Sequence, residues 1–187
     1  GVTNAINWVD GLDGLAAGIT FITSLGFIYL SFYNRNFVSG YFSLCLAGSS
    51  FGFLLKNFYP ASILMGDSGS YFLGIKLAIL SLLSTNSYSH LDKVRSSPNY
   101  NIYIAFCFLI LPLLDMIFVI IRRLLKNKSP FYGDKSHLHH RLLNLGYSHK
   151  IVVFIILSLT ICTVIFTTSL ALDVWYWFNK RFKYLEN

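Results

Sequence analysis

Three short polar clusters, set between long apolar stretches, hold the side chains most capable of chemistry. Only 8 of the 187 residues are aspartate or glutamate, and half of these eight lie within the clusters. Carboxylates, amides and histidines bind divalent metals and phosphate, and histidine also moves protons. Such a concentration predicts an active site. The clusters are Asn4–Leu15 (Asn-Ala-Ile-Asn-Trp-Val-Asp-Gly-Leu-Asp-Gly-Leu), Met65–Ser70 (Met-Gly-Asp-Ser-Gly-Ser) and Asp134–Arg141 (Asp-Lys-Ser-His-Leu-His-His-Arg).

The first cluster spaces its polar side chains for one helix face. Asn7, Asp10 and Asp13 are three residues apart, so in a helix they lie near one another. Oxygen ligands grouped in this way suit Mg2+ and the polar edges of a nucleotide. The alternative is an N-capping and turn segment at the start of a membrane helix. Three glycines in and just after this cluster have no side chain, so we expect them to leave room for a ligand to approach the same face closely. They are Gly11, Gly14 and Gly18.

Asp67, in the second cluster, comes just before an apolar stretch. At a helix N-terminus a carboxylate can hold a metal while the first backbone N–H groups face phosphate. A simple helix N-cap explains the same residues without any ligand.

The third cluster joins three histidines to cations: His137, His139 and His140 stand beside Lys135 and Arg141. Histidine can donate hydrogen bonds to phosphate, act as an acid or base, or ligate a metal. The neighbouring cations favour an anionic ligand over zinc. A solvated loop is the alternative.

Asp115 lies in the middle of the apolar stretch Leu111–Ile121, where a charge is expensive. A carboxylate at the bilayer centre costs roughly 2.5–3.5 kcal/mol, so we expect a partner or a role for it. Both a hydrogen bond or ion pair between helices and a direct part in catalysis fit. Pro112 predicts a kink in the same helix.

The composition is that of a polytopic membrane protein. Hydrophobic residues make up 55% and charged residues 12% of the chain, and the mean hydropathy is +0.57. Apolar stretches long enough to cross a bilayer predict an all-α transmembrane bundle with about five spans. The predicted spans are Leu15–Phe32, Val38–Leu55, Tyr71–Leu83, Ile102–Ile121 and Ile151–Leu172.

Five alternating spans would bring all three clusters out on one side of the membrane. The connection that carries the histidines is rich in lysine and arginine, which predicts the cytoplasmic side. We attribute the net charge of +7 to this topology and to phosphate or anionic lipid, and expect no nucleic-acid partner. The chain begins at Gly1 inside a dense motif with no signal pattern before it, so we expect it to be part of a longer protein.

The ordered motifs resemble the polyprenyl-phosphate N-acetylhexosamine-1-phosphate transferases of glycosyltransferase family 4. The spacing His-x-His-His is similar to the branch that transfers GlcNAc-1-phosphate, whereas three adjacent histidines are usual in the muramoyl-pentapeptide branch. Beyond the first and second clusters, the resemblance rests on Asn57–Ala61, Pro112–Asp115, Arg122-Arg123, Lys128–Phe131 and His137–Leu143.

The resemblance implies that residues 1–187 are the C-terminal portion of one integral-membrane transferase domain. The implied reaction moves a sugar-1-phosphate from a UDP-N-acetylhexosamine to a polyprenyl phosphate and releases UMP. It would be the first step of a lipid-linked cell-envelope glycan at the bacterial plasma membrane. Mg2+ is the implied cofactor, with Mn2+ as an alternative, and a homodimer is left open.

The same resemblance assigns roles to individual residues. Asp67 would be the metal ligand, and Asn57 would contact the uracil. The remaining assignments are Asn7, Asp10 and Asp13 for the nucleotide and metal site, His137, His139 and His140 for the diphosphate, and Lys135 and Arg141 for substrate binding.

Two features depart from the family pattern. Leu64 stands where an aromatic residue is common, and no Asp-Asp pair occurs in this chain, although the family carries one in an earlier loop. Two alternatives therefore stay open: a different sugar donor within the family, such as the muramoyl-pentapeptide, and an inactive membrane remnant.

Overall fold

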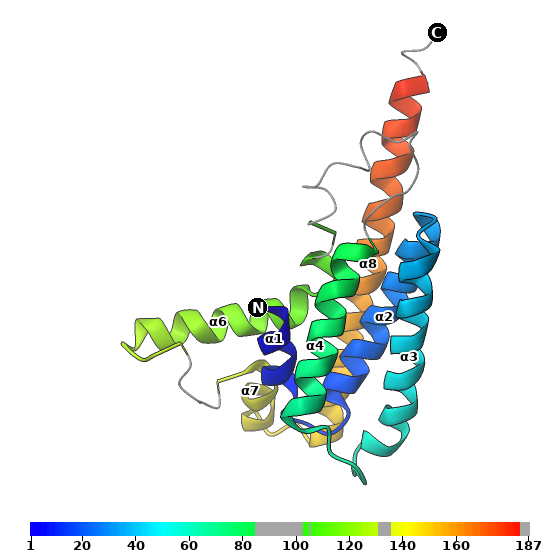
Figure 1. Cartoon of the computed structure of the whole chain (residues 1–187). Coiled ribbons are helices and arrows are strands. Elements are labelled where there is room, and N and C mark those ends of the chain that lie inside the picture. Colours follow the sequence, from blue (N-terminus) through cyan, green and yellow to red (C-terminus); the bar gives the residue numbers. More distant parts are fainter. Residues whose placement is uncertain (85–102, 105, 131–135, 184–187) are drawn as a thin grey trace.

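The computed structural model describes residues 1–84, 103–104, 106–130 and 136–183, with side chains up to residue 171. Within these ranges the chain is helical, without a strand. Figure 1 shows α2, α3, α4 and α8 side by side and α6 running transversely away from them, next to α1, so the predicted all-α bundle is confirmed. The helices are α1 (Val2–Val9), α2 (Leu15–Tyr33), α3 (Phe37–Asn57), α4 (Gly66–Leu83), α6 (Ile110–Leu125), α7 (Leu138–Asn144) and α8 (His149–Lys183).

Three helices in the described part of the chain are long and apolar enough to cross a membrane. They are α2, α3 and the segment His149–Ala171 of α8, and they match the first, second and fifth predicted spans. The third predicted span forms α4, an 18-residue helix that carries the exposed Lys76 and runs beside α2 and α3 (Figure 1). Helix α8 continues to Lys183, beyond the predicted end at Leu172.

The fourth predicted span, Ile102–Ile121, is wrong as a single crossing. The chain turns at Leu109, and α6 then begins at Ile110 and runs for 16 residues sideways, away from the long helices (Figure 1). Pro112 supplies the reason, because proline lacks an N–H and its ring clashes with the carbonyl four residues earlier. Proline is tolerated only in a first helical turn. Pro112 therefore begins a new helix and does not kink a long one.

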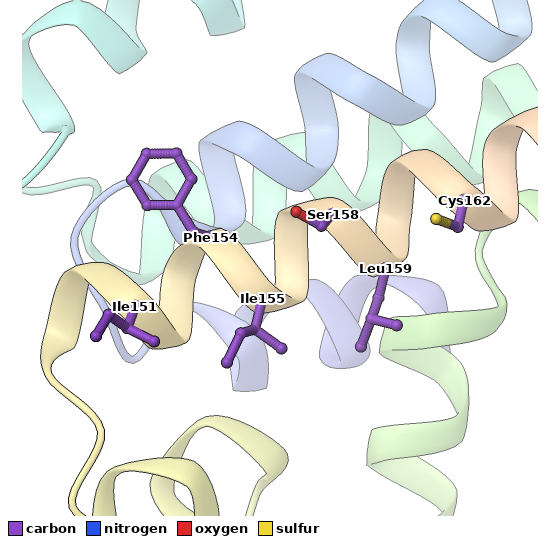
Figure 2. Close-up of a pocket in the computed structure, with 6 residues that line it drawn as sticks. All are labelled: Ile151, Phe154, Ile155, Ser158, Leu159 and Cys162. Atoms are coloured by element: carbon purple, nitrogen blue, oxygen red, sulfur yellow. The ribbon is translucent and has the colours of Figure 1, made fainter.

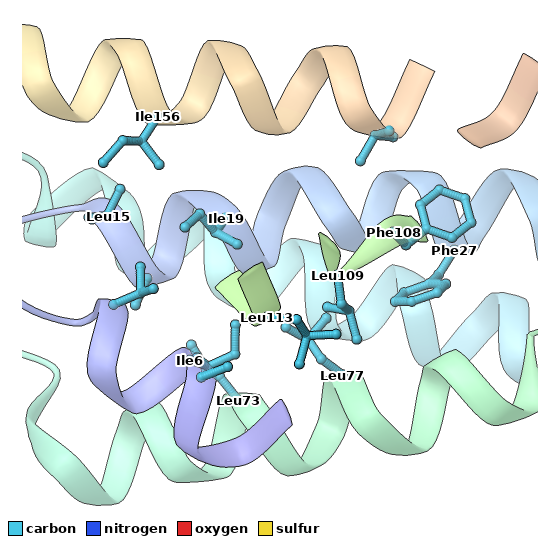
Figure 3. Packing of buried hydrophobic residues seen from close by; sticks show 14 of the residues in the cluster. Ile6, Leu15, Ile19, Phe27, Leu73, Leu77, Phe108, Leu109, Leu113 and Ile156 are labelled. Atoms are coloured by element: carbon cyan, nitrogen blue, oxygen red, sulfur yellow. The ribbon is translucent and has the colours of Figure 1, made fainter. Parts of the chain in front are cut away.

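Helix α2 occupies the centre of the bundle. In the most apolar 18-residue stretch of α2, 67% is buried inside the protein. The corresponding value is 33% for each of the other two candidate spans. Figure 3 shows its apolar side chains meeting those of the surrounding helices, and the rings of Phe27 and Phe108 lie 4.9 Å apart between centroids. The shared core includes Ile6, Leu15, Ile19, Leu73, Leu77, Leu109, Leu113 and Ile156.

Small residues allow the helices to approach closely. Lipid is as apolar as leucine, so helix association inside a membrane depends on tight packing and not on the hydrophobic effect. At Gly74 of α4 an added Cβ would lie 2.7 Å from the Cα of Thr3 in α1. This contact seats α1, with its polar residues, against the beginning of α4.

Candidate active site

The first two clusters meet at an acidic centre, which consists of Asn7, Asp10 and Asp67. The Asn7 amide Nδ2 donates to Asp67 Oδ1 at 3.1 Å and to the Ser70 hydroxyl at 2.9 Å. Asp67 lies in the first turn of α4 and is exposed. Gly66, just before it, has a φ of +66°, a left-handed conformation that glycine adopts without steric cost. The carboxylate is thus held in place by one neutral donor and faces solvent.

Asp10 feels both burial and the charge of Asp67. Burial is the larger cause and the negative charge of Asp67 the second, and together they raise the pKa of Asp10 from 3.8 to about 6. A buried carboxylate whose ionisation is disfavoured by a second carboxylate nearby forms with it a donor pair suited to a cation. The two residues came from separate sequence clusters, so the predicted convergence of these clusters is present in the fold.

Asp13 and Asn57 fasten the turn before α2 to the connection between α3 and α4. Asp13 Oδ2 accepts from the backbone N–H of Ala61 at 3.1 Å. Asn57 is 4% exposed; its Oδ1 accepts from Gly14 N at 3.0 Å, and its Nδ2 donates to Ile63 O at 2.8 Å. Both side chains therefore have structural bonds, and their predicted contacts with a nucleotide stay predictions.

The third cluster forms a histidine segment, residues 136–141, at the same end of the fold. His137 Nδ1 lies 2.9 Å from Asp115 Oδ2, and Asp115 Oδ1 accepts from the backbone N–H of Leu138 at 2.7 Å. The predicted partner of Asp115 is therefore found, and it belongs to the histidine cluster. The rings of His137 and His139 stack at 5.8 Å, and those of His139 and His140 lie 4.3 Å apart.

His139 joins the histidine segment to the first cluster. A Cβ added at Gly11 would lie 2.3 Å from His139 Nε2, so only glycine leaves room for this ring. Burial is the main cause that lowers the pKa of His139 to about 4, and the charges of His140 and His137 add to it against the opposing charge of Asp115. The ring is therefore neutral at neutral pH.

The glycines of the first cluster admit side chains of this chain, so the predicted open face for a ligand is wrong. Gly11 faces His139, Gly14 faces Phe58 and Gly18 faces Leu157. Gly14 also has a φ of +79°, which the turn into α2 requires.

Helix α6 ends with two arginines whose roles the residue pattern did not indicate, and one of them bonds the histidine segment. Arg122 donates to Ser136 O at 3.1 Å, and Arg123 donates to Pro130 O. Arg123 is 3% exposed and its guanidinium lies 4.9 Å from the ring of Trp8. The sequence did contain one indication of these roles: the arginine pair lies at the end of an amphipathic helix, shortly before the histidines.

The other predicted residues of this cluster differ in position. His140 is half-buried and Arg141 is exposed. Lys135, with Asp134, lies outside the described residues.

A separate hollow of about 420 Å³ runs along α8 (Figure 2). Its lining is almost entirely apolar, and it includes none of the predicted site residues. The lining residues are Ile151, Phe154, Ile155, Ser158, Leu159 and Cys162.

The donor set of the acidic centre fits Mg2+. Within the described ranges no three His, Cys, Asp or Glu side chains form a group that could hold a metal. Mg2+ commonly takes only one or two carboxylates and fills its other positions with water and substrate phosphates. Asp10 and Asp67 supply that pair of carboxylates, and the charge of Asp67 disfavours the ionisation of Asp10.

Helices long and apolar enough to span a membrane define a membrane protein, and its carboxylates and histidines meet at one end of the bundle. Residues 1–85 match the model of glycosyl transferase family 4. The chain belongs to this family, as the motifs predicted.

Similar proteins cover more of the chain. Over 157 residues, 83% of this chain, it is 43% identical to a probable undecaprenyl-phosphate N-acetylglucosaminyl 1-phosphate transferase of Bacillus subtilis. It is 42% identical over 168 residues, again 83% of the chain, to a decaprenyl-phosphate N-acetylglucosaminephosphotransferase of Mycobacterium tuberculosis. A phospho-N-acetylmuramoyl-pentapeptide-transferase of Heliobacterium modesticaldum is 48% identical over 84 residues, 45% of this chain and 26% of that protein. The chain spans only 41% of the length of each of the first two relatives.

Proposed function

We propose that the protein transfers GlcNAc-1-phosphate from UDP-GlcNAc to a polyprenyl phosphate in the membrane and releases UMP. The observation that carries this proposal is the meeting of three distant sequence clusters at one site. Asn7 bonds Asp67 across 60 positions of sequence, and Gly11 lies against His139. The names of the similar proteins from Bacillus subtilis and Mycobacterium tuberculosis supply the reaction class.

The charges of the site match the demands of this reaction. Phosphoryl transfer depends mainly on positioning the reactants and neutralising charge. Mg2+ bound by Asp67 and Asp10 would offset the negative charge of the phosphates. Arg141, exposed in α7, and the ring of His140 provide further groups that bind anionic oxygens. Neutral His139 packs beneath Gly11 and keeps the turn that carries Asp10 against the histidine segment.

We place the site on the cytoplasmic side of a bacterial plasma membrane. Support comes from the basic residues near the histidine segment, since positive residues prefer the cytoplasmic ends of spans. The spans keep the lipid tail in hydrocarbon while its phosphate reaches the polar end of the bundle. The product would begin a lipid-linked glycan of the cell envelope.

The test is UMP release by the full-length protein, purified in detergent, with UDP-GlcNAc, polyprenyl phosphate and Mg2+. We expect UMP and polyprenyl-diphosphate-linked GlcNAc in equal amounts, and loss of both when a chelator is added. Absence of the lipid product with folded full-length protein would contradict the proposal. Turnover that is unchanged in chelator would contradict the metal assignment alone.

A second donor is favoured by one observation, the 48% identity to a muramoyl-pentapeptide transferase over 84 residues. Competition between UDP-GlcNAc and UDP-MurNAc-pentapeptide separates the two. We expect UDP-GlcNAc to be used and the pentapeptide donor neither to react nor to compete. Preferential use of the pentapeptide donor would assign the protein to the muramoyl-pentapeptide branch of the family.

A further inference from the structure

Asp115 uses each of its two carboxylate oxygens on a different group of the histidine segment. Oδ1 accepts the backbone N–H of Leu138, and Oδ2 meets the Nδ1 of His137. The side chains are largely shielded from water, with 8% of His137 and 11% of Asp115 exposed. A backbone N–H can only donate, so Asp115 acts as an acceptor at Oδ1.

The same carboxylate decides which nitrogen of His137 carries the proton. A lone pair on Nδ1 would face the lone pairs of Oδ2, whereas a proton on Nδ1 makes a charge-assisted hydrogen bond. The ring is also fixed from the sides, by the edge of Trp8 at 5.7 Å and by the stacked ring of His139 at 5.8 Å. In the neutral ring, Nε2 is then the nitrogen with a lone pair.

Simple fastening of α6 to the histidine segment does not explain a carboxylate at this place. Arg122 already ties α6 to the backbone of the histidine segment at Ser136. Burying a carboxylate costs more than burying a neutral acceptor that could bond Leu138 equally well. The imidazole of His137 is the partner that explains why this position carries a charged carboxylate and not a neutral acceptor.

We propose that Asp115 is a positioning residue that holds the proton on Nδ1 of His137, so that Nε2 presents its lone pair as the acceptor for a proton carried by an oxygen of the reacting phosphates. This inference rests on the proposed function for the identity of the ligand. The state of the ring itself does not depend on that identity. Carboxylates orient catalytic imidazoles in the same way in hydrolase triads.

Asp115→Asn separates this role from capping of α7. The amide oxygen of the variant can still accept from Leu138, but its NH2 group donates and therefore demands an unprotonated Nδ1. We expect nitrogen NMR of histidine-labelled full-length protein to show Nδ1 protonated in the wild type and Nε2 protonated in Asp115→Asn. The His137 signals are assigned by their loss in His137→Gln. Asp115→Glu should retain the wild-type tautomer. Identical tautomers in wild type and Asp115→Asn would overturn the proposal.

A double-mutant cycle supplies the activity test. We expect Asp115→Asn to lower kcat about 100-fold with little change in KM for the donor, and Asp115→Glu to recover most of it. In a His137→Gln background, Asp115→Asn should cost less than about 3-fold further if the two residues act as a unit. An equal loss in both backgrounds would show that Asp115 acts independently of His137 and would overturn the proposal. If the wild type releases no UMP, the proposed function fails while the NMR result still decides the tautomer.

Discussion

The acidic centre and the histidine segment lie at one site but are built in opposite ways. In the acidic centre, burial and the charge of Asp67 disfavour the ionisation of Asp10, and the bonded donor is the neutral amide of Asn7. In the histidine segment, His137 has a carboxylate partner and a ring neighbour on either side. One region is left with excess negative charge, and the other is held by bonds within the chain.

The difference indicates how each region meets its ligand. Two nearby carboxylates destabilise the folded protein when both are charged, and a bound cation would remove this repulsion. We therefore expect the acidic centre to need a bound cation. A ring already fixed by its neighbours loses little freedom when a ligand arrives, so the histidine segment is ready before binding. Substitutions should therefore separate activity from stability in the acidic centre and change both in the histidine segment.

The largest effect is expected from Asp67→Asn. We predict a loss of kcat of about 1,000-fold, because loss of a preorganised charge contact costs this much in other active sites. Stability should be unchanged or slightly higher, since the amide still accepts from Asn7 and no longer repels Asp10. UMP release and thermal unfolding in the same detergent measure the two quantities. Ser68→Ala, at the exposed neighbour, is the control and should retain activity. A strongly destabilised Asp67→Asn would remove the contrast between the two regions.

The sequence was sufficient to identify the family and most of the helices, but it did not show how the helices are joined. Hydropathy located α2, α3 and α8 because long apolar stretches have few alternatives to spanning. It failed at Ile102–Ile121, since hydropathy does not register that Pro112 forces a new helix and a change of direction. Motif spacing selected Asp10, Asp67 and the histidines. It did not reveal that Asn57 bonds two backbone groups or that Asp115 faces His137, because such pairings depend on packing between distant segments.

The second effect concerns the contact that seats α1 on α4. In Gly74→Ala the new Cβ would lie 2.7 Å from a backbone Cα of Thr3, which cannot rotate away. We predict a loss of about 1–3 kcal/mol in stability, as for other overpacked interiors, with activity lost as Asn7 moves from Asp67. Gly48→Ala is the matched control, because that helical glycine has open space around it and alanine favours the helix. Equal unfolding temperatures for the two variants would contradict the seating role of Gly74.

The smallest effect is a pH dependence of stability carried by Asp10. Its pKa is raised from 3.8 to about 6, so between these values the folded protein keeps a proton that the unfolded chain releases. Asp10 therefore makes stability fall as pH rises through this window. Asp10→Asn lacks the titration and should be more stable than the wild type above pH 6, by about 1 kcal/mol once solvent screening of this part-exposed group is allowed for.

His139 provides an opposite slope in the same window. Its pKa is lowered from 6.5 to about 4, so its contribution to stability is complete above its ordinary pKa and is lost as pH falls toward 4. In the wild type the two slopes partly cancel; in Asp10→Asn the loss on acidification should stand alone and be steeper. Thermal unfolding at a series of pH values from 4 to 8 measures this. The difference should shrink in an Asp67→Asn background, which removes the charge but not the burial. Parallel curves for Asp10→Asn and the wild type would mean that the acidic centre carries no excess charge, and that the cation it is built for must be sought elsewhere.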